Sequence, residues 1–325
     1  MKKVLQFSLT IFLSAIPIHA QQIGSIQTPL QRMWLKSENG LILAWHKVNV
    51  RGTDGAGIVR VFDDHGHAIA SLNVLQAVPG ANNVSIWDVS AKPQQSIAVG
   101  ATYTKSGPSD VSSTLLYFNS DGTLASAFAL EPQKEIALLE LDDSLNAWTV
   151  TWSTYDNASS SPSLVVEYDS HGSVVRQLLA RTLFPPHETA IVQNPQVGFA
   201  TGGFDSGNFW FWLPSSTDLV TIRCADGKVL SREKTGYPIA SGVTLFPSMM
   251  TRDASGAFIA EMRVADPKTP SKASLAYYAW TPETKSWTGI QQNMCEGNRL
   301  IGMNHNAEIF VHLDSNTTVC SYSRP

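Results

Sequence analysis

The sequence predicts an all-β fold that is built from repeated four-stranded units. Two kinds of hairpin alternate along the chain, and one round of both takes roughly 50 residues, the length of a four-stranded repeat. Gly and Asx residues stand at the expected turns. No stretch shows the apolar periodicity of a long amphipathic helix, which argues against an α/β fold.

The first kind of hairpin joins two strands through a turn that contains Asp or Asn and Gly. Its clearest copy runs from Val59 to Ile69, with Asp63 and Gly66 in the turn. β-branched and aromatic residues favour the strands, the Asx side chain bonds backbone amides, and Gly adopts the positive φ that the turn requires. Other copies occupy residues 115–124, 165–175 and 220–230, and a copy without the Gly occupies residues 276–287.

The second kind of hairpin lies between successive copies of the first. Its copies occupy residues 35–45, 89–99, 141–150, 192–200, 250–260 and 303–311. Six copies therefore stand against five of the first kind, and one more candidate strand follows at residues 318–322. The segment Ile23-Gly24-Ser25-Ile26 has no other place, so we expect it to supply the missing strand.

Four strands per repeat are typical of the blades of a β-propeller. The hairpins predict six blades, the last of which is closed by the N-terminal strand, because a closed ring leaves no unpaired end blade. A five-bladed or open ring with a C-terminal tail is the alternative. The first five blades are expected at about residues 29–76, 80–130, 135–182, 188–235 and 242–290, and residues 298–325 form the sixth.

The N-terminus has the three-part form of a secretory signal. A start with two lysines precedes an apolar run from Val4 to Ile16, and Ala20 precedes a polar segment. We expect cleavage after Ala20, so that residues 1–20 are a signal peptide and residues 21–325 the propeller. The run is shorter than the ~20 residues of a spanning helix, so no membrane span is expected. The product is expected in the periplasm or outside the cell.

The composition suits a large apolar core, with 43% hydrophobic and 15% charged residues. The net charge of −4 gives no basic footprint for nucleic acid or an anionic membrane. We expect a monomer without a cofactor. Of the three cysteines, Cys295 and Cys320 are the preferred disulfide pair and Cys224 is left over. Three unpaired thiols remain an equal alternative, because spacing does not test the required Cα separation.

The Phe/Tyr-Asp-x-x-Gly hairpins give the chain a resemblance to bacterial secreted β-propellers. The resemblance covers almost all of the segment after residue 20, and its motif is a turn motif. It therefore implies an architecture rather than an activity, since propellers of this type include binding scaffolds, hydrolases, lyases and oxidoreductases.

Catalytic and metal motifs are missing from the sequence. It holds no Gly-x-Ser-x-Gly elbow, phosphate-binding Gly loop, His-Glu-x-x-His or Cys-x-x-Cys. The run from Asp63 to His67 combines carboxylates and imidazoles, but it is also the turn of the first repeat, and tight turns point their side chains outward. We therefore expect no metal site there.

The segment at residues 202–214 departs from the polar loops of the other blades. It is either an ordinary strand packed between blades, which we favour, or an aromatic platform for a sugar, a peptide or another protein. In the second interpretation, the segment 202–214 and the connections between blades gather on one face of the propeller, around its central channel. The expected binding residues are then Phe209, Trp210, Trp212, Asp205, His187, Glu188, Tyr237 and Glu296.

Two functions follow from that face. The first is a non-catalytic propeller that binds a protein or a glycan. The alternative is a hydrolase or lyase that acts on carbohydrate, in which Asp205, Glu188 or Glu296 would form an acid–base pair. The sequence alone does not decide whether the protein is an enzyme.

Overall fold

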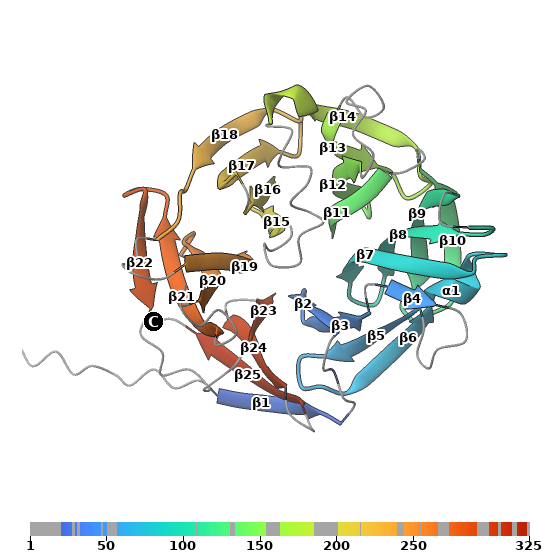
Figure 1. Ribbon diagram of the computed structural model, residues 1–325, viewed down its shortest axis with the longest axis horizontal. Helices are drawn as coiled ribbons and strands as arrows, with labels where there is room; N and C mark the ends of the chain where they lie inside the picture. The colour runs from blue at the N-terminus through green and yellow to red at the C-terminus, as the bar shows by residue number, and fades with distance from the viewer. Residues whose placement is uncertain are drawn as a thin grey trace, which may run out of the picture.

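The protein folds into a ring of antiparallel sheets (Figure 1). The computed structural model describes residues 21–27, 30, 33–46, 48–50, 57–107, 110–130, 134–153, 163–184, 201–214, 216–238, 244–253, 255–265, 273–290, 299–304, 307–313 and 317–323. Most of these residues form strands. The helices among them are the short α1 (Val74–Ala77) and η1 (Arg181–Leu183).

Three sheets of the ring have four strands each. They comprise β11 (Lys134–Leu141), β12 (Ala147–Ser153), β13 (Ser163–Tyr168) and β14 (Val174–Ala180); β15 (Thr201–Asp205), β16 (Asn208–Leu213), β17 (Asp218–Arg223) and β18 (Val229–Lys234); and β19 (Thr244–Arg252), β20 (Phe258–Ala265), β21 (Ala273–Thr281) and β22 (Ser286–Ile290). A fourth sheet comprises β7 (Asn83–Lys92), β8 (Ser96–Thr104), β9 (Val111–Asn119), β10 (Leu124–Ala129) and the additional strand β4 (Val48–Val50).

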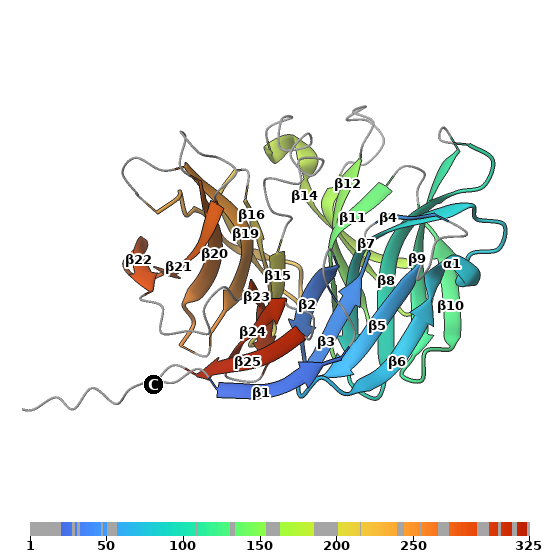
Figure 2. The ribbon, with the colours of Figure 1, turned by 60° about the horizontal axis from the view of Figure 1, so that its bottom comes forward.

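The remaining sheet has eight strands and contains both ends of the described chain. One half comprises β2 (Trp34–Glu38), β3 (Leu41–Trp45), β5 (Ile58–Asp63) and β6 (Ala68–Asn73), and the other β23 (Arg299–Asn304), β24 (Ala307–Leu313), β25 (Thr317–Ser323) and β1 (Gln21–Ile26). The halves meet at a single parallel pair, Ser37 opposite Gly302. The N-terminal strand β1 pairs antiparallel with β25, which is the pairing predicted from the unequal hairpin counts (Figure 2).

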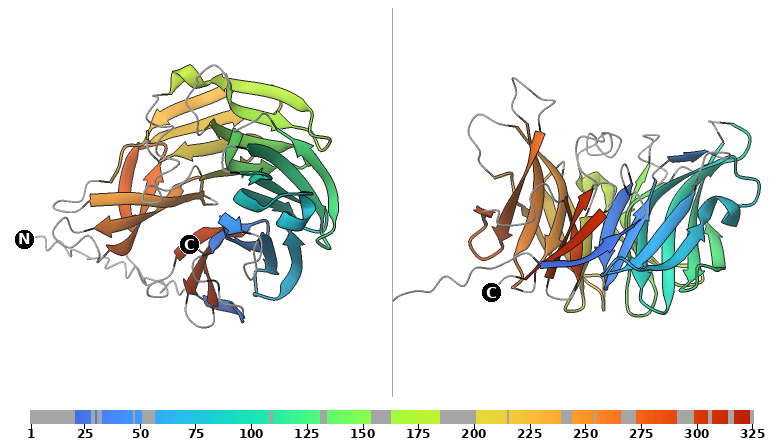
Figure 3. Two further views of the ribbon diagram at one scale, coloured as in Figure 1. Left: turned by 45° about the vertical axis from the view of Figure 1, so that its right-hand side comes forward. Right: turned by 90° about the horizontal axis from the view of Figure 1, so that it is seen from below.

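Strands run between the two faces of the ring (Figure 3). We call β2, β7, β11, β15, β19 and β23 the inner strands, because they lie nearest the centre in Figure 1. Each inner strand runs from the face at which the chain enters the sheet, the crossover face, to the face that carries the hairpin turns, the turn face. Trp34, Thr201 and Arg299 begin inner strands at the crossover face, whereas Asp205 and Arg252 end inner strands at the turn face.

The repeated turn glycines each dock onto an outer strand beside them. All four have a positive φ, and a Cβ on any of them would lie under 3.0 Å from an atom of that outer strand. The contacts are those of Gly66 with Ser25 in β1, Gly122 with Ser71 in β6, Gly172 with Phe128 in β10, and Gly227 with Leu178 in β14. β1 therefore receives the same contact as the outer strands of complete sheets.

The turn of the copy without a glycine also contacts the outer strand of a neighbouring sheet, but through an ion pair. Lys285 takes the positive φ of the turn, at 50°, and its ammonium lies 3.3 Å from the carboxylate of Glu233 in the outer strand β18. An ion pair thus stands where the other copies have a close backbone contact.

The cores lie between neighbouring sheets rather than within one layer. One cluster joins the two halves of the eight-stranded sheet, with Ile26 of β1 packed among Ile42, Phe62, Ile309 and Val319. Its members come from both ends of the chain, so this cluster needs both ends in place.

The predicted hairpins agree with the observed strands except in one sheet. The expected copy at residues 192–200 lies outside the described residues, and the hairpin that precedes β17 in its sheet is formed by β15 and β16. The turn between them is Ser206-Gly207, with φ of 48° and 77°. The segment 202–214 is therefore a hairpin of the sheet and not a loop between hairpins.

Candidate functional site

A cavity of about 1220 Å³ occupies the centre of the ring. Residues from all of the inner strands line it, and it extends from Trp34 and Arg299 at the crossover face to Asp205 and Arg252 at the turn face. Its wall is rich in charged side chains and includes the indole of Trp87. The cavity is the natural place to look for a ligand, because binding sites are concave and contain a few converging polar groups.

Three carboxylates converge on one ammonium group in the wall. Lys36 Nζ of β2 lies 2.8 Å from Glu140 Oε1 of β11, 3.2 Å from Glu38 Oε2 of β2 and 3.5 Å from Asp88 Oδ2 of β7. It also donates to the carbonyls of Val89, at 3.2 Å, and Leu139, at 2.9 Å. One lysine thus links three inner strands. We call Lys36, Glu38, Asp88 and Glu140 the Lys36 cluster.

Burial and charge perturb the titration of this cluster. Burial alone would lower the pKa of Lys36, but the nearby carboxylates of Asp88, Glu140 and Glu38 raise it above its ordinary value. Burial raises the pKa of Glu140 well above its usual range, and the charges of Glu38 and Asp88 add to this effect. Burial also raises the pKa of Asp88. Lys36 therefore stays charged, and burial favours the neutral form of both Glu140 and Asp88.

Internal donors hold two of these carboxylates. Asp88 accepts the amide of Val89 at 2.8 Å and the amide of Leu139 at 2.7 Å, one on each oxygen. Glu38 accepts the hydroxyl of Ser90 at 2.6 Å. These bonds fasten neighbouring inner strands, and they leave Asp88 and Glu38 little freedom to act on a ligand.

A different charge pattern marks the wall formed by β19, β20 and β23. Buried Glu261 of β20 accepts the amide of Leu300 at 2.7 Å and the hydroxyl of Ser248. Arg263 and Arg299 line the cavity beside this carboxylate, and both are exposed. Burial raises the pKa of Glu261, although Ser248 and Arg299 counteract it.

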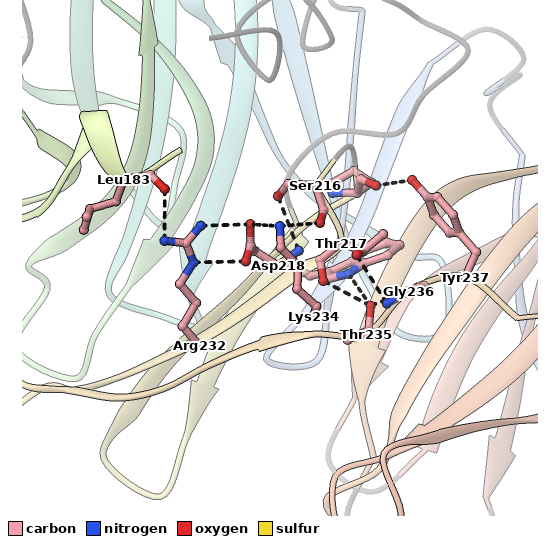
Figure 4. A network of polar contacts seen from close by, with 11 residues as sticks. Leu183, Ser216, Thr217, Asp218, Arg232, Lys234, Thr235, Gly236 and Tyr237 are labelled. Carbon is pink, nitrogen blue, oxygen red and sulfur yellow. Dashed lines mark hydrogen bonds and ion pairs between the residues drawn. The ribbon is translucent and has the colours of Figure 1, made fainter. Parts of the chain in front are cut away.

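The expected site residues of β16 lie in the core. Phe209 and Trp212 are completely buried and Trp210 is 3% exposed, so they do not form the exposed platform that one interpretation expected. The physical reason is that β16 is covered on both faces by neighbouring sheets. Trp212 Nε1 donates to Thr235 Oγ1 at 3.2 Å, and Figure 4 shows this threonine within a network around Asp218. Only Trp210 also reaches the cavity wall.

Asp205 and Tyr237 do not come together. Asp205 pairs with Asn208 at the turn-face end of its sheet, where it forms an ion pair with Arg252. Tyr237 follows β18 at the opposite end, and its hydroxyl donates to the carbonyl of Pro214 (Figure 4). The expected convergence is wrong for this pair, because the misassigned hairpin reversed the direction in which residues 202–205 run.

Three further expected site residues, His187, Glu188 and Glu296, lie outside the described residues. So does Cys295, while Cys320 is buried in β25, and the disulfide between them stays a prediction. The turn around Asp63 places Asp63, Asp64 and His65 close together at the surface. Hydrogen bonds inside the turn explain this arrangement, since Asp63 accepts the amides of His65 and His67.

The Lys36 cluster was not predicted from the sequence. A signal was present, because positions 36, 88 and 140 are spaced by 52 residues and lie in three successive inner strands. Charged residues that recur at about the repeat period indicate side chains that meet at the axis.

Comparison with known proteins supports the fold. No protein-family model and no curated protein sequence matches the chain. Among solved structures, a putative exported protein from Bacteroides fragilis is similar with a TM-score of 0.52 and 8% identity over 94% of this chain and 95% of that one. A glucose dehydrogenase is similar with a TM-score of 0.51 and 11% identity over 94% and 99%.

A third similar structure is the β-propeller domain of Cps50 (Swd1) from Myceliophteria thermophila, with a TM-score of 0.45 and 10% identity over 94% of this chain and 100% of that one. At such identities the likeness concerns the fold alone. The ring of antiparallel sheets, most of them with four strands, is by itself the architecture of a β-propeller. Among the described residues, no helix has the length and apolarity needed to cross a membrane.

Proposed function

We propose that the protein is an exported, non-catalytic β-propeller of six blades that binds a carbohydrate in its central cavity. The blade count treats the two halves of the eight-stranded sheet as separate blades, which leaves β1 as the outer strand of the last one. Export rests on the N-terminal signal and points to the periplasm or the extracellular space.

The observation that carries the proposal is the mixed wall of the cavity. Trp34 and Trp87 are half-buried, lie on neighbouring inner strands and both line the cavity. Indole rings offer a flat apolar surface with a polar edge, which suits a sugar ring. The charged groups around them supply hydrogen-bond partners for hydroxyls. The aromatic surface thus lies on β2 and β7, and not on β16 as one interpretation of the sequence expected.

Binding is favoured over catalysis because the carboxylates of the wall already have partners. Asp205 forms an ion pair with Arg252, and Glu261 accepts bonds from Ser248 and Leu300. A glycosidase needs one carboxyl to donate a proton and a second to act as base or nucleophile. The best candidate for a proton donor is Glu140, whose pKa is raised by burial, and the Lys36 cluster therefore keeps the hydrolase alternative testable.

The test is binding of the mature chain, residues 21–325, to a glycan array, followed by titration calorimetry with the best oligosaccharide. Trp34→Ala and Trp87→Ala are each expected to weaken binding by about fivefold, since one lost aromatic contact is worth roughly 1 kcal/mol. Trp287→Ala is the matched control, because Trp287 is also half-buried but lies on the outer strand β22.

Three results would separate the alternatives. Equal loss in all three tryptophan variants would place the site elsewhere. Absence of binding to every glycan would contradict the proposal. Release of reducing sugar that depends on Glu140, and disappears in Glu140→Gln, would replace binding by hydrolysis.

A further inference from the structure

The cations of the cavity wall fall into two groups. Lys36 and Lys92 each have a carboxylate within 2.8 Å, from Glu140 and Asp143 respectively, and Arg252 pairs with Asp205. Within the described part of the chain, no such ion pair is formed by Arg263 or Arg299, and both side chains are exposed. The wall therefore carries two guanidinium groups whose charge is open to a ligand.

Strand geometry brings these two arginines to one place. Arg263 stands two residues after Glu261 on β20, so both side chains lie on the same face of the sheet. Glu261 on that face bonds to the amide of Leu300, the residue that follows Arg299 on β23. Arg299 is near enough to lower the pKa of Glu261 electrostatically. Both guanidinium groups thus belong to the crossover-face mouth of the cavity, beside Glu261.

Glu261 does not neutralise the pair. Its two oxygens accept Ser248 and Leu300, and the hydroxyl of Tyr277 bonds to it as well. A carboxylate held in this way is part of the wall. Two cations against one such carboxylate leave a local excess of positive charge at this mouth.

The part of the wall formed by β2, β7 and β11 has the reverse balance. The Lys36 cluster sets three carboxylates against one ammonium group. An anionic group would be repelled there and attracted at the arginines, so the wall orients a ligand that carries a single negative group. Guanidinium groups bind carboxylate and sulfate oxygens through paired N–H donors. Trp34 begins β2 at the same face and lies in the same wall, where a pyranose ring can rest on it.

We infer that the crossover-face mouth binds an anionic sugar residue, with Arg263 and Arg299 on its carboxylate or sulfate group. The inference deepens the proposed function and rests on it. It names the class of glycan, an acidic polysaccharide or its fragments, and it fixes the direction in which the acidic residue enters the cavity.

The experiment is titration calorimetry of the mature chain with three oligomers of one length. They are an oligogalacturonate, a sulfated galactan oligomer and a neutral galactan oligomer. At least one anionic oligomer is expected to bind ten- to a hundredfold more tightly than the neutral one, the effect of a charge-assisted hydrogen bond. The two anionic arms distinguish carboxylate from sulfate. The advantage should shrink as NaCl is raised, while neutral binding stays constant.

The variant R263Q/R299Q is expected to abolish that advantage, and R252Q is the matched control because Arg252 lies at the other mouth and already has a carboxylate partner. Exposed Arg263 and Arg299 can be changed without a loss of fold, which thermal melting checks. Binding of the neutral oligomer as tightly as both anionic ones, or an advantage that survives in R263Q/R299Q, overturns this inference alone. Failure of these oligomers and of every glycan on the array overturns the proposed function with it.

Discussion

The fully buried side chain of Ile26 offers a direct test of ring closure. The change Ile26→Ala removes three carbons from the cluster that joins β1 to β3, β5, β24 and β25. At about 0.8 kcal/mol for each buried carbon, transfer alone accounts for about 2.4 kcal/mol. The cavity that remains brings the expected loss in the free energy of unfolding to about 2–5 kcal/mol.

The assay is urea unfolding of residues 21–325, followed by the fluorescence of the tryptophans. The matched control is Ile69→Ala, because Ile69 lies on the outer strand β6 with 50% of its surface exposed. That change should cost less than about 0.5 kcal/mol. If I26A and I69A unfold at the same urea concentration as the wild type, β1 is not part of the folded ring and the closure described above is wrong.

Three further predictions follow from the polar and backbone contacts. Gly172 and Gly207 both have a positive φ, but only a Cβ at Gly172 would meet another sheet, at 2.2 Å from Phe128. G172A should therefore lower the free energy of unfolding in urea by about 1–3 kcal/mol more than G207A does. Equal losses in the two variants would show that this contact does not stabilise the fold. Lys36→Met leaves buried carboxylates without their cation and should lower the free energy of unfolding in urea by about 3–5 kcal/mol. Lys92→Met should lower it by less than about 1 kcal/mol, because the partner of Lys92, Asp143, is exposed. Similar losses in the two variants would contradict the linking role of Lys36. Burial alone would raise the pKa of Asp218, but the hydrogen bonds from Arg232 and Lys234 outweigh burial and lower this pKa below its ordinary value of 3.8. The stabilisation that ionised Asp218 gives the folded state is therefore present above pH 3.8 and is lost as the pH falls through the lowered pKa. D218N should therefore lose less stability than the wild type on acidification in that range, and parallel pH curves would refute this.

The hairpins could be predicted because their information is local. In the first repeat, Asp63 accepts two backbone amides of the turn and Gly66 supplies the positive φ. Both requirements act within five residues, and each leaves a readable mark in the sequence. The same turn signal located the first three copies with a glycine and the looser fourth.

The sheet of β15, β16, β17 and β18 shows where local information misleads. Asn194 and Gly198 resemble the Asx and Gly residues of a turn. The observed turn, Ser206-Gly207, also combines an Asx residue, Asp205, with a glycine. The alternation of apolar and polar residues would normally decide between them. It is lost in β16, because both faces of that strand are buried. A continuous apolar run therefore left two interpretations open, a platform of exposed aromatics and the favoured strand packed between blades, and β16 confirms the second.

The cavity wall was the least predictable part. Lys36 meets Asp88 and Glu140 only after three separate strands have been placed around one axis. Arg263 and Arg299 likewise come from different strands and belong to no motif. Their meeting depends on the order and stagger of the sheets, which a single sequence does not display.

The pairing of β1 with β25 has a consequence for the way the chain is made. β1 is synthesised before every other described strand, and its partner is synthesised after them. The ring therefore cannot close before β25 has been translated and exported, and the edge of β25 stays open until β1 pairs with it. During that interval the β1 segment of another molecule has the same complementarity to this edge. Slow translocation and a high local concentration should then favour exchange of this strand between copies, and early removal of the segment by a protease should leave an incomplete ring prone to association.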